Sequence, residues 1–440
     1  MRDAVQDYTP EEAEKMCGVP AELIRKTARS YATTRKAGIY YTLGITEHSH
    51  GTDNVYALAN LVLLTGHLGG PSMGLNPLRG QNNVQGANDA GASPIYYPGY
   101  QRVDDKQCQA KFEKLWKRDL SPNPGLNLNE MMKAAGDQVR AFFVMGEDIL
   151  LSEPNVLALE ERMNRIEFVV LQDIFPNETL RYADVVFPAG NFAEKEGVFV
   201  NSERRMQRVR KAVNPPGEAR ADWEILLELG RRVSARRDLD PSVWSHQTPA
   251  QIFREFSASA DNFAGITHER LDQPAPDGFT GLQWPCSDEQ DPGTKYLHEG
   301  GVLRGKGLLT AVAYRPSMEL PDNSATQTRR DEGLDAKQSE AFVQIHPRDA
   351  RKRGIDEGDL VEVKTRRGVI QVVAHVSRQV RPGCIWMSLH FAEARANVLT
   401  NDAIEPGHPG LFPGSHFHHA PRGAGADSEA GVLEAENQKS

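Results

Sequence analysis

The 440-residue sequence is poor in cysteine. Its four cysteines, Cys17, Cys108, Cys286 and Cys384, are scattered, and no two of them form a Cys-x-x-Cys pair. Such pairs are typical of disulfide frameworks, zinc sites and iron–sulfur sites. We therefore expect none of these in this chain, and we predict no metal-ligand set within it.

The sequence also lacks long hydrophobic runs. No apolar stretch is long enough to cross a membrane, and the first residues, MRDAVQDYTPEE, contain no hydrophobic signal core. Basic residues are not in excess, because 51 Lys and Arg stand against 60 Asp and Glu, a net charge of −9. These absences predict no membrane span, no nucleic-acid partner and, by default, a cytoplasmic location.

A third absence is the Gly-x-Gly-x-x-Gly fingerprint behind a strand. The nearest glycine group, Gly66, Gly69 and Gly70, follows a segment at 54–64 with helical apolar spacing. The fingerprint binds a dinucleotide only in the order strand, turn, helix. We therefore reject a nicotinamide-binding Rossmann site.

Alternating apolar segments in the middle of the chain predict a parallel sheet. The strand-like runs are 139–144, 168–171 and 184–187, and the helical patterns between them are 155–163 and 177–182. Strands that alternate with helices form βαβ units, and ligands bind at the carboxyl ends of their strands.

Acidic side chains fall at these strand ends. Glu147 and Asp148 follow the first strand, and Asp173 follows the second. Carboxylates suit ribose hydroxyls or guanine ring nitrogens better than phosphates, which they repel. The alternative is that these acids interact with helix dipoles, and Asp222 has the alternative role of an N-cap for the helical run after it.

The stretch from Gly74 to Asp89, GLNPLRGQNNVQGAND, stands out by its composition. It holds glycines, side-chain amides and one cation, Arg79, and it has no apolar period, so we expect no core helix or strand there. Glycines permit close approach of the backbone to a ligand, and amides offer both donors and acceptors. Arg79 is a fixed fork suited to a carboxylate. The alternative is a glycine-rich surface turn.

From Phe342 the pattern changes to short strands separated by glycine turns. Residues 342–346, 359–365 and 369–376 are strand-like, and a helix is expected before Gly354. This pattern favours a small β-barrel or sandwich. Residues 407–440 have the composition of a disordered tail.

The stretch 74–89, with Leu43–Asn54 upstream, resembles the loop beside the active site in the alpha (catalytic) subunit of molybdenum- or tungsten-dependent formate dehydrogenases. These enzymes belong to the molybdopterin oxidoreductase family. The resemblance continues, with interruptions, to about Thr400. It implies an enzyme that oxidises formate to CO2, or runs the reverse reaction, with a bis-molybdopterin guanine dinucleotide cofactor that carries Mo or W.

Complete members of the family begin with cysteines that bind a [4Fe-4S] cluster, and they supply a Cys or selenocysteine metal ligand followed directly by His. None of the four cysteines here precedes a histidine. The sequence therefore resembles the C-terminal portion of such a subunit. The implied partners are formate or CO2, an N-terminal half or other formate dehydrogenase subunits, and an electron acceptor.

The resemblance also implies a fold and its domains. The fold class is α/β, with a parallel-sheet Rossmann-like cofactor-binding domain followed by a small C-terminal β-barrel of the double-psi type. The expected domains are a helical remnant of a preceding domain at 1–37, an α/β molybdopterin guanine dinucleotide-binding domain at 38–235, an irregular excursion and linker at 236–325, a β-barrel dinucleotide-binding domain at 326–405 and a disordered tail at 406–440.

Family positions that match this sequence imply its site residues. The catalytic residues implied are Arg79 and Gln81. The cofactor-binding residues implied are Leu43, Gly44, His48, Gly80, Gly146, Glu147, Asp148, Ser152, Leu171, Gln172, Asp173, Ile174, Asn177, Asp222, His390 and Asn397.

The sequence departs from the family between Asn323 and Thr328, where members carry about twenty more residues that include a strand. The loss of a strand would leave neighbouring backbone groups unpaired, so we expect a weakened C-terminal domain. Three alternatives to formate dehydrogenase stay open: another molybdopterin oxidoreductase such as nitrate reductase, a non-catalytic cofactor-binding module, or a gene remnant.

Overall fold

The computed structural model describes residues 8–46, 51–153, 155–274, 278–297, 336, 338–365, 367–388 and 391–400, and the backbone of 434–437. The expected gap at 323–328 and the candidate residues His48 and His390 lie outside these ranges. None of the helices in the described ranges combines the length and apolar character that a membrane crossing needs.

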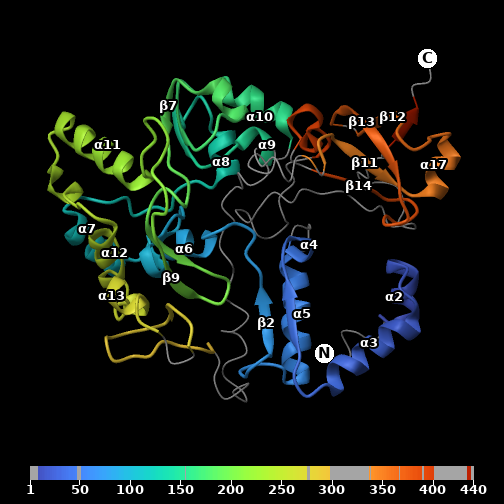
Figure 1. Cartoon of the computed structure of the whole chain (residues 1–440), viewed down its shortest axis with the longest axis horizontal. Helices are drawn as coiled ribbons and strands as arrows, with labels where there is room; N and C mark the ends of the chain where they lie inside the picture. Colours follow the sequence, from blue (N-terminus) through green and yellow to red (C-terminus); the bar gives the residue numbers. More distant parts are fainter. Residues whose placement is uncertain are drawn as a thin grey trace.

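Two helices, α2 (Pro10–Cys17) and α3 (Ala21–Thr33), begin the described chain, within the segment 1–37 that we expected to be helical. The Thr9 hydroxyl accepts a hydrogen bond from the Glu12 amide at 3.2 Å, and Pro10 occupies the first helical position. Gly18 ends α2 with φ 70°, a left-handed conformation that favours glycine. Figure 1 shows this pair in dark blue, set apart from the green α/β region.

Strand β1 (Gly38–Tyr41) pairs in parallel with β2 (Gly74–Pro77), and α4 (Leu43–Thr46) and α5 (Gly51–Thr65) connect them. Figure 1 shows β2 and α5 side by side. Tyr41 is the register partner of Pro77, and the amide of Leu78 donates to the Tyr41 carbonyl at 2.8 Å. The carboxyl ends of both strands therefore lie at one edge.

The stretch 74–89 is more regular than the sequence predicts. It contains strand β2 and a short helix, α6 (Val84–Asp89), which starts after Asn83 in the left-handed region at φ 65°. The prediction of no core helix or strand was therefore wrong. An apolar period is missing because α6 buries Gln85, Asn88 and Asp89 alongside Val84. Polar burial of this kind is costly unless the groups are hydrogen-bonded, and it points to function.

Strands β5 (Ala141–Met145), β6 (Phe168–Asp173) and β7 (Val185–Pro188) form the predicted parallel sheet in the order β5-β6-β7. Helices α8 (Leu128–Lys133), α9 (Ile149–Ser152) and α10 (Val156–Met163) pack on one face, and η2 (Glu178–Tyr182) links β6 to β7. Leu150 and Leu171 are fully or almost fully buried in the core that results. This agreement confirms the α/β class with parallel sheets.

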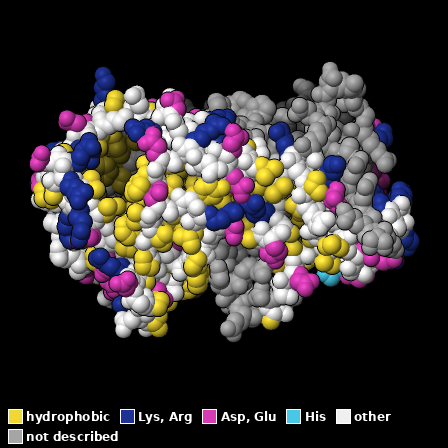
Figure 2. Space-filling view, turned by 90° about the horizontal axis from the view of Figure 1, so that it is seen from above, with side chains coloured by type: hydrophobic (Ala, Val, Ile, Leu, Met, Phe, Trp, Pro, Cys, Tyr) yellow, Lys and Arg dark blue, Asp and Glu magenta, His cyan; other side chains and the backbone are white. Residues whose placement is uncertain are grey.

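The opposite face of this sheet exposes apolar side chains. Along β5, Phe142 and Val144 are buried, whereas Phe143 and Met145 are 40% and 49% exposed. Figure 2 shows hydrophobic side chains gathered around a hollow on the upper surface. Parallel sheets are usually covered on both faces, and the described residues cover this face only in part.

A second sheet is antiparallel, with the order β10-β9-β8. Its strands are β8 (Gly197–Val200), β9 (Arg205–Val209) and β10 (Leu282–Gln283), and its core cluster includes Phe263 and Trp284. We expected an irregular excursion from residue 236, yet the described residues to 297 contain helices packed around this core. Aromatic residues from separate segments meet there, with the ring centroids of Phe263 and Trp284 5.5 Å apart.

The remaining elements of the first 297 residues connect these sheets. They are β3 (Tyr96–Tyr97), η1 (Pro98–Tyr100), β4 (Gln101–Arg102), α7 (Lys106–Trp116), α11 (Asp222–Arg236), η3 (Pro241–Trp244), α12 (Pro249–Ala258), η4 (Asp261–Phe263) and α13 (His268–Leu271).

The C-terminal unit is a five-stranded mixed sheet in the order β14-β11-β13-β12-β15. Its elements are β11 (Phe342–Ile345), α17 (Pro347–Arg353), β12 (Leu360–Lys364), β13 (Val369–Val376), β14 (Ile385–Met387), η5 (Ala392–Ala394), η6 (Ala396–Leu399) and β15 (Glu434–Asn437). The strands at 342–346, 359–365 and 369–376 and the helix before Gly354 are confirmed. Strand β15 falls within the tail that we expected to be disordered.

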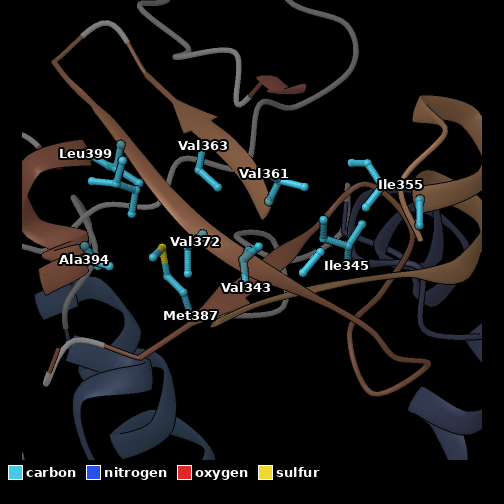
Figure 3. Close-up of a cluster of buried hydrophobic side chains, with 13 residues drawn as sticks. Val343, Ile345, Ile355, Val361, Val363, Val372, Met387, Ala394 and Leu399 are labelled. Atoms are coloured by element: carbon cyan, nitrogen blue, oxygen red, sulfur yellow. The ribbon is translucent and has the colours of Figure 1, made fainter. Parts of the chain in front are cut away.

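Figure 3 shows the buried core of this unit, where Val343, Ile345, Val361 and Val363 point toward one another. Each is at most 2% exposed, and full burial of such a side chain contributes about 1.5–3 kcal/mol. The unit therefore has a core of its own. The double-psi barrel stays a prediction, because the described strands form a mixed sheet with two edges.

Candidate functional site

Arg79 lies just past the carboxyl end of β2, beside the end of β1. Its Nε donates to the Oε1 of Gln85 at 3.1 Å, and its backbone amide donates to the Ser202 hydroxyl at 3.1 Å. The side chain is half-buried. The Ser202 contact holds the backbone of Arg79 and the Gln85 contact holds the inner nitrogen of its guanidinium, so together they fix the direction of the fork.

The outer part of the Arg79 fork makes no ion pair and no Nη hydrogen bond with any residue in the described ranges. The charge of Arg79 acts on the Tyr41 phenol. Burial raises the pKa of Tyr41, and the positive charge of Arg79 opposes that rise. A half-buried guanidinium of this kind suits a small planar anion, which accepts two parallel hydrogen bonds.

The neighbours of Arg79 present amide and backbone groups. Gln81 is half-buried, and its Oε1 is buried without a hydrogen-bond partner among the described residues. Gly80 and Gly44 are exposed, and Leu43, at the start of α4, is half-buried. Two of the predicted site residues therefore lie in the loop after β2, and Leu43 and Gly44 lie in the first turn of α4, directly after β1.

The buried carboxylate of Asp89 contacts Gln85 through the amide nitrogen, whereas Arg79 contacts the amide oxygen. The Nε2 of Gln85 donates to the Oδ1 of Asp89 at 2.7 Å and to the Tyr100 hydroxyl at 2.9 Å, and that hydroxyl donates to the same Oδ1 at 2.7 Å. Asp89 is fully buried, and burial raises its pKa to about 6 while the Tyr100 hydrogen bond opposes the shift. We did not identify Gln85, Asp89 or Tyr100 from the sequence.

A second group of predicted residues lies at the carboxyl edge of the parallel sheet. Gly146 follows β5 with φ 65°, and its amide donates to the Gln172 carbonyl at 2.9 Å. Leu171 and Gln172 are buried in β6. The register of β5 against β6 brings these strand ends together, as the sequence predicts for a parallel sheet.

Glu147 and Asp148 have different surroundings. Asp148 accepts from the amides of Glu178 and Thr179 at 3.3 Å each and from the Thr179 hydroxyl at 3.1 Å. These bonds satisfy the start of η2, so the helix-terminus interpretation describes Asp148. The Glu147 carboxylate accepts a short hydrogen bond from the Ser152 hydroxyl.

Asp173 and Asn177 form one unit at the end of β6. The Nδ2 of Asn177 donates to the Asp173 Oδ2 at 2.7 Å and to the Glu147 carbonyl at 3.2 Å. The other Asp173 oxygen accepts from the Ile174 amide at 2.6 Å. This unit joins the ends of β5 and β6.

Asp222 connects helix α11 to the same edge. Gln172 Nε2 donates to its Oδ1 at 2.8 Å, and Lys195 forms an ion pair with its Oδ2. The N-cap position belongs to Ala221, and Asp222 makes no cap bond, so the N-cap interpretation was wrong. Asp222 lies in the first turn of α11, and its carboxylate contacts Gln172 and Lys195.

The segment that holds Lys195 links the two groups. Lys195 contacts Asp222 at the sheet edge, and Ser202 accepts from the Arg79 amide seven residues later. Between them, the Val200 amide donates to the Asn83 side chain at 2.9 Å. The charge-rich run 194–205 therefore spans the distance between the strand edge and the arginine loop.

Asn397 joins the C-terminal unit to the α/β unit. Its Nδ2 donates to the carbonyls of Glu153 at 2.7 Å, Leu150 at 3.0 Å and Leu151 at 3.4 Å. These bonds satisfy carbonyls at the end of α9. The structure thus gives Asn397 a docking role.

Two acceptors at the sheet edge lack hydrogen-bond partners in the described part of the chain. The Oε1 of Gln172 and the Oδ1 of Asn177 are buried and accept no hydrogen bond from the described residues. Buried polar atoms normally have partners. A guanine ring and a ribose carry N–H and O–H donors, so these acceptors and the carboxylates beside them fit the nucleoside end of a dinucleotide.

The fold is that of an α/β protein whose parallel sheet carries polar and acidic side chains at its carboxyl edge, with Arg79 in a separate loop. The sequence profile of the molybdopterin oxidoreductase family matches residues 10–232, and that of the molydopterin dinucleotide binding domain matches 319–410. The chain belongs to the molybdopterin oxidoreductase family.

Curated relatives include formate dehydrogenases. An F420-dependent formate dehydrogenase subunit alpha of Methanocaldococcus jannaschii is 41% identical over 92% of this chain and 61% of its own length. Formate dehydrogenase H of Escherichia coli is 35% identical over 92% of this chain and 58% of its own length. The chain thus spans about three fifths of the length of these relatives.

A solved structure with a similar fold is acetylene hydratase from Pelobacter acetylenicus. It matches with a TM-score of 0.60 and 16% sequence identity, and the match covers 91% of this chain and 62% of that chain. At this identity the likeness shows the fold alone.

Proposed function

We propose that this chain is part of a formate dehydrogenase that oxidises formate to CO2, or runs the reverse reaction. The observation that carries the proposal is the Arg79 fork, which is half-buried and has no ion-pair partner in the described ranges. Formate is a planar carboxylate of one carbon, and it fits a bidentate fork held in a loop of amides. Two relatives named formate dehydrogenase match this chain over 92% of its length.

Arg79 binds the carboxylate and orients the C–H bond away from the guanidinium. Fixing that orientation accounts for a large part of a catalytic effect, because a misaligned substrate does not react. Gln81, whose Oε1 is buried without a partner in the described ranges, would contact the pterin. The oxidation breaks the C–H bond and releases CO2, one proton and two electrons.

The cofactor is a bis-molybdopterin guanine dinucleotide with Mo or W, and when bound it supplies the centre that accepts the two electrons. We assign one guanine dinucleotide arm to the sheet edge formed by Gly146, Glu147, Gln172, Asp173 and Asp222. A [4Fe-4S] cluster in another part of the enzyme and an external acceptor complete the electron path. The C-terminal unit is proposed as a double-psi barrel, and the location as cytoplasmic.

Nitrate is the competing substrate, because it is also a small planar anion. The names of the relatives favour formate. A neutral substrate such as acetylene leaves the Arg79 charge without a partner, so the fold likeness to acetylene hydratase does not favour that chemistry.

The test assembles this chain with the polypeptide that completes the length of its relatives and loads the cofactor. We expect formate-dependent reduction of a viologen dye and no nitrate-dependent oxidation of the reduced dye. Nitrate turnover without formate turnover would reassign the substrate. Cofactor binding without either activity would support the non-catalytic module.

A further inference from the structure

The hydrogen bonds around Gln85 impose one orientation on its amide. A carboxylate only accepts hydrogen bonds. Asp89 Oδ1 therefore requires a donor from Gln85, and the Nε2 group faces it at 2.7 Å. The Oε1 of Gln85 must then lie on the opposite side, where it accepts from Arg79 Nε at 3.1 Å.

The Tyr100 hydroxyl closes this arrangement. It donates to Asp89 Oδ1 and accepts from Gln85 Nε2 at 2.9 Å, so both hydrogens of the Gln85 amide are used. Tyr100 reaches this position through a tight turn in which it has φ 62° and Gly99 has φ 73°. A Cβ on Gly99 would lie 2.3 Å from that of Ala260, so the turn requires glycine. Backbone strain of this kind persists only where surrounding structure maintains it.

Helix α6 provides the spacing. Gln85 and Asp89 are four residues apart and lie on one face of the helix, where both are buried. Asp89 is fully buried and makes no ion pair with Arg79, since Gln85 stands between them. A buried carboxylate destabilises the fold unless it serves a specific contact.

We propose that Asp89 and Tyr100 are positioning residues that fix the Gln85 amide and, through it, the direction in which the Arg79 fork faces its anion. The identity of that anion as formate rests on the proposed function. The positioning of Arg79 does not, and it is measurable in the chain without cofactor.

The first experiment measures how fast phenylglyoxal modifies Arg79 in the 440-residue chain, by peptide mass spectrometry. Asp89→Leu removes the acceptor and frees the Gln85 amide to rotate. We expect modification about fivefold to tenfold faster, the size expected from the net loss of one ordinary hydrogen bond. Tyr100→Phe should give a smaller increase, and Asn88→Leu, on the same helix and equally buried, should stay within about twofold of wild type.

Formate protection separates the two proposals. In the wild-type chain, formate should slow the modification of Arg79, and Asp89→Leu should need about tenfold more formate for half-protection. No protection in wild type would remove formate from Arg79, while faster modification in Asp89→Leu would still support positioning. Unchanged rates in both Asp89→Leu and Tyr100→Phe would overturn the positioning proposal.

Asp89→Asn is a second variant that tests the proposal if Asp89→Leu misfolds. Asparagine has similar volume, but its amide can present either a donor or an acceptor to Gln85, so we expect an intermediate rate. If Asp89→Leu does not fold, Asp89→Asn and Tyr100→Phe decide the question, and wild-type rates in both would contradict it.

The assembled enzyme offers a readout that a purely structural role would not change. The titratable or charged groups that face Asp89 in the described part are the Tyr100 phenol from η1 and the Arg79 guanidinium from the loop after β2. Below pH about 6 Asp89 takes up a proton and becomes able to donate. We expect kcat/KM for formate to fall below that pH in wild type and to stay constant there in Asp89→Asn. The same fall of kcat/KM in Asp89→Asn would show that another group causes it.

Discussion

Asn177 donates a hydrogen bond to Asp173 across one turn of chain at the end of β6, with 2.7 Å between Nδ2 and Oδ2. The same amide nitrogen reaches the carbonyl of Glu147 at the end of β5. Two strand ends are therefore held by one side chain, and the Asn177 oxygen, which is buried, accepts from none of the described residues. Such a preformed edge needs little rearrangement to bind a ligand.

Asp173→Ala should weaken cofactor retention more than the chemical step. The carboxylate accepts hydrogen bonds from guanine or ribose in our assignment, and it lies at the sheet edge rather than in the Arg79 loop. The measurement is pterin content per protein after purification, with the exposed Asp137→Ala as the control. Full occupancy combined with reduced turnover would contradict the assignment.

The unfolding free energy of the chain should depend on pH through the protonation of Asp89. Its pKa rises from 3.8 to about 6 on folding, so the folded state binds the proton more tightly. The stability that this proton provides is fully present below pH about 4 and is lost as pH rises through about 6, a change of roughly 3 kcal/mol.

Asp89→Asn cannot titrate, so the difference in unfolding free energy between wild type and this variant should change by that amount between about pH 4 and pH 7. Urea unfolding at several pH values measures it. A constant difference would show that Asp89 has an ordinary pKa in the folded chain.

Asn397→Ala should weaken the attachment of the C-terminal unit. The variant leaves three carbonyls at the end of α9 without their donor, which costs about 1–3 kcal/mol. Urea midpoints for this variant and for the exposed Asn164→Ala should differ accordingly. Pterin content at equal folded fraction then tests the predicted cofactor contact. Equal midpoints would remove the docking role.

Elements with a simple apolar pattern could be predicted from the sequence. Residues 169–171 are buried in the central parallel strand, which ends at Asp173 as expected. Thr9 and Pro10 mark the start of α2 by local chemistry alone. In both cases the determining interactions are near in sequence.

The support for Arg79 could not be predicted in this way. Gln85 and Asp89 have helical spacing, but they are polar. A rule that predicts helices from the spacing of apolar residues therefore does not predict α6. Tyr100 joins them through a turn with positive φ. Asn397 contacts carbonyls up to 247 residues away. These contacts arise from tertiary packing, and a single sequence carries no signal of it.

The most direct test of the account is kcat/KM for formate in the assembled, cofactor-loaded enzyme with Arg79→Lys. Lysine keeps the charge but loses the fork and the Nε bond to Gln85, so we predict a loss of about tenfold or more, from one charge-assisted bond. Arg140→Lys, on the surface in an ion pair with Glu167, is the matched control and should retain wild-type kinetics. Unchanged kinetics in Arg79→Lys would contradict the assignment of Arg79 to the substrate site.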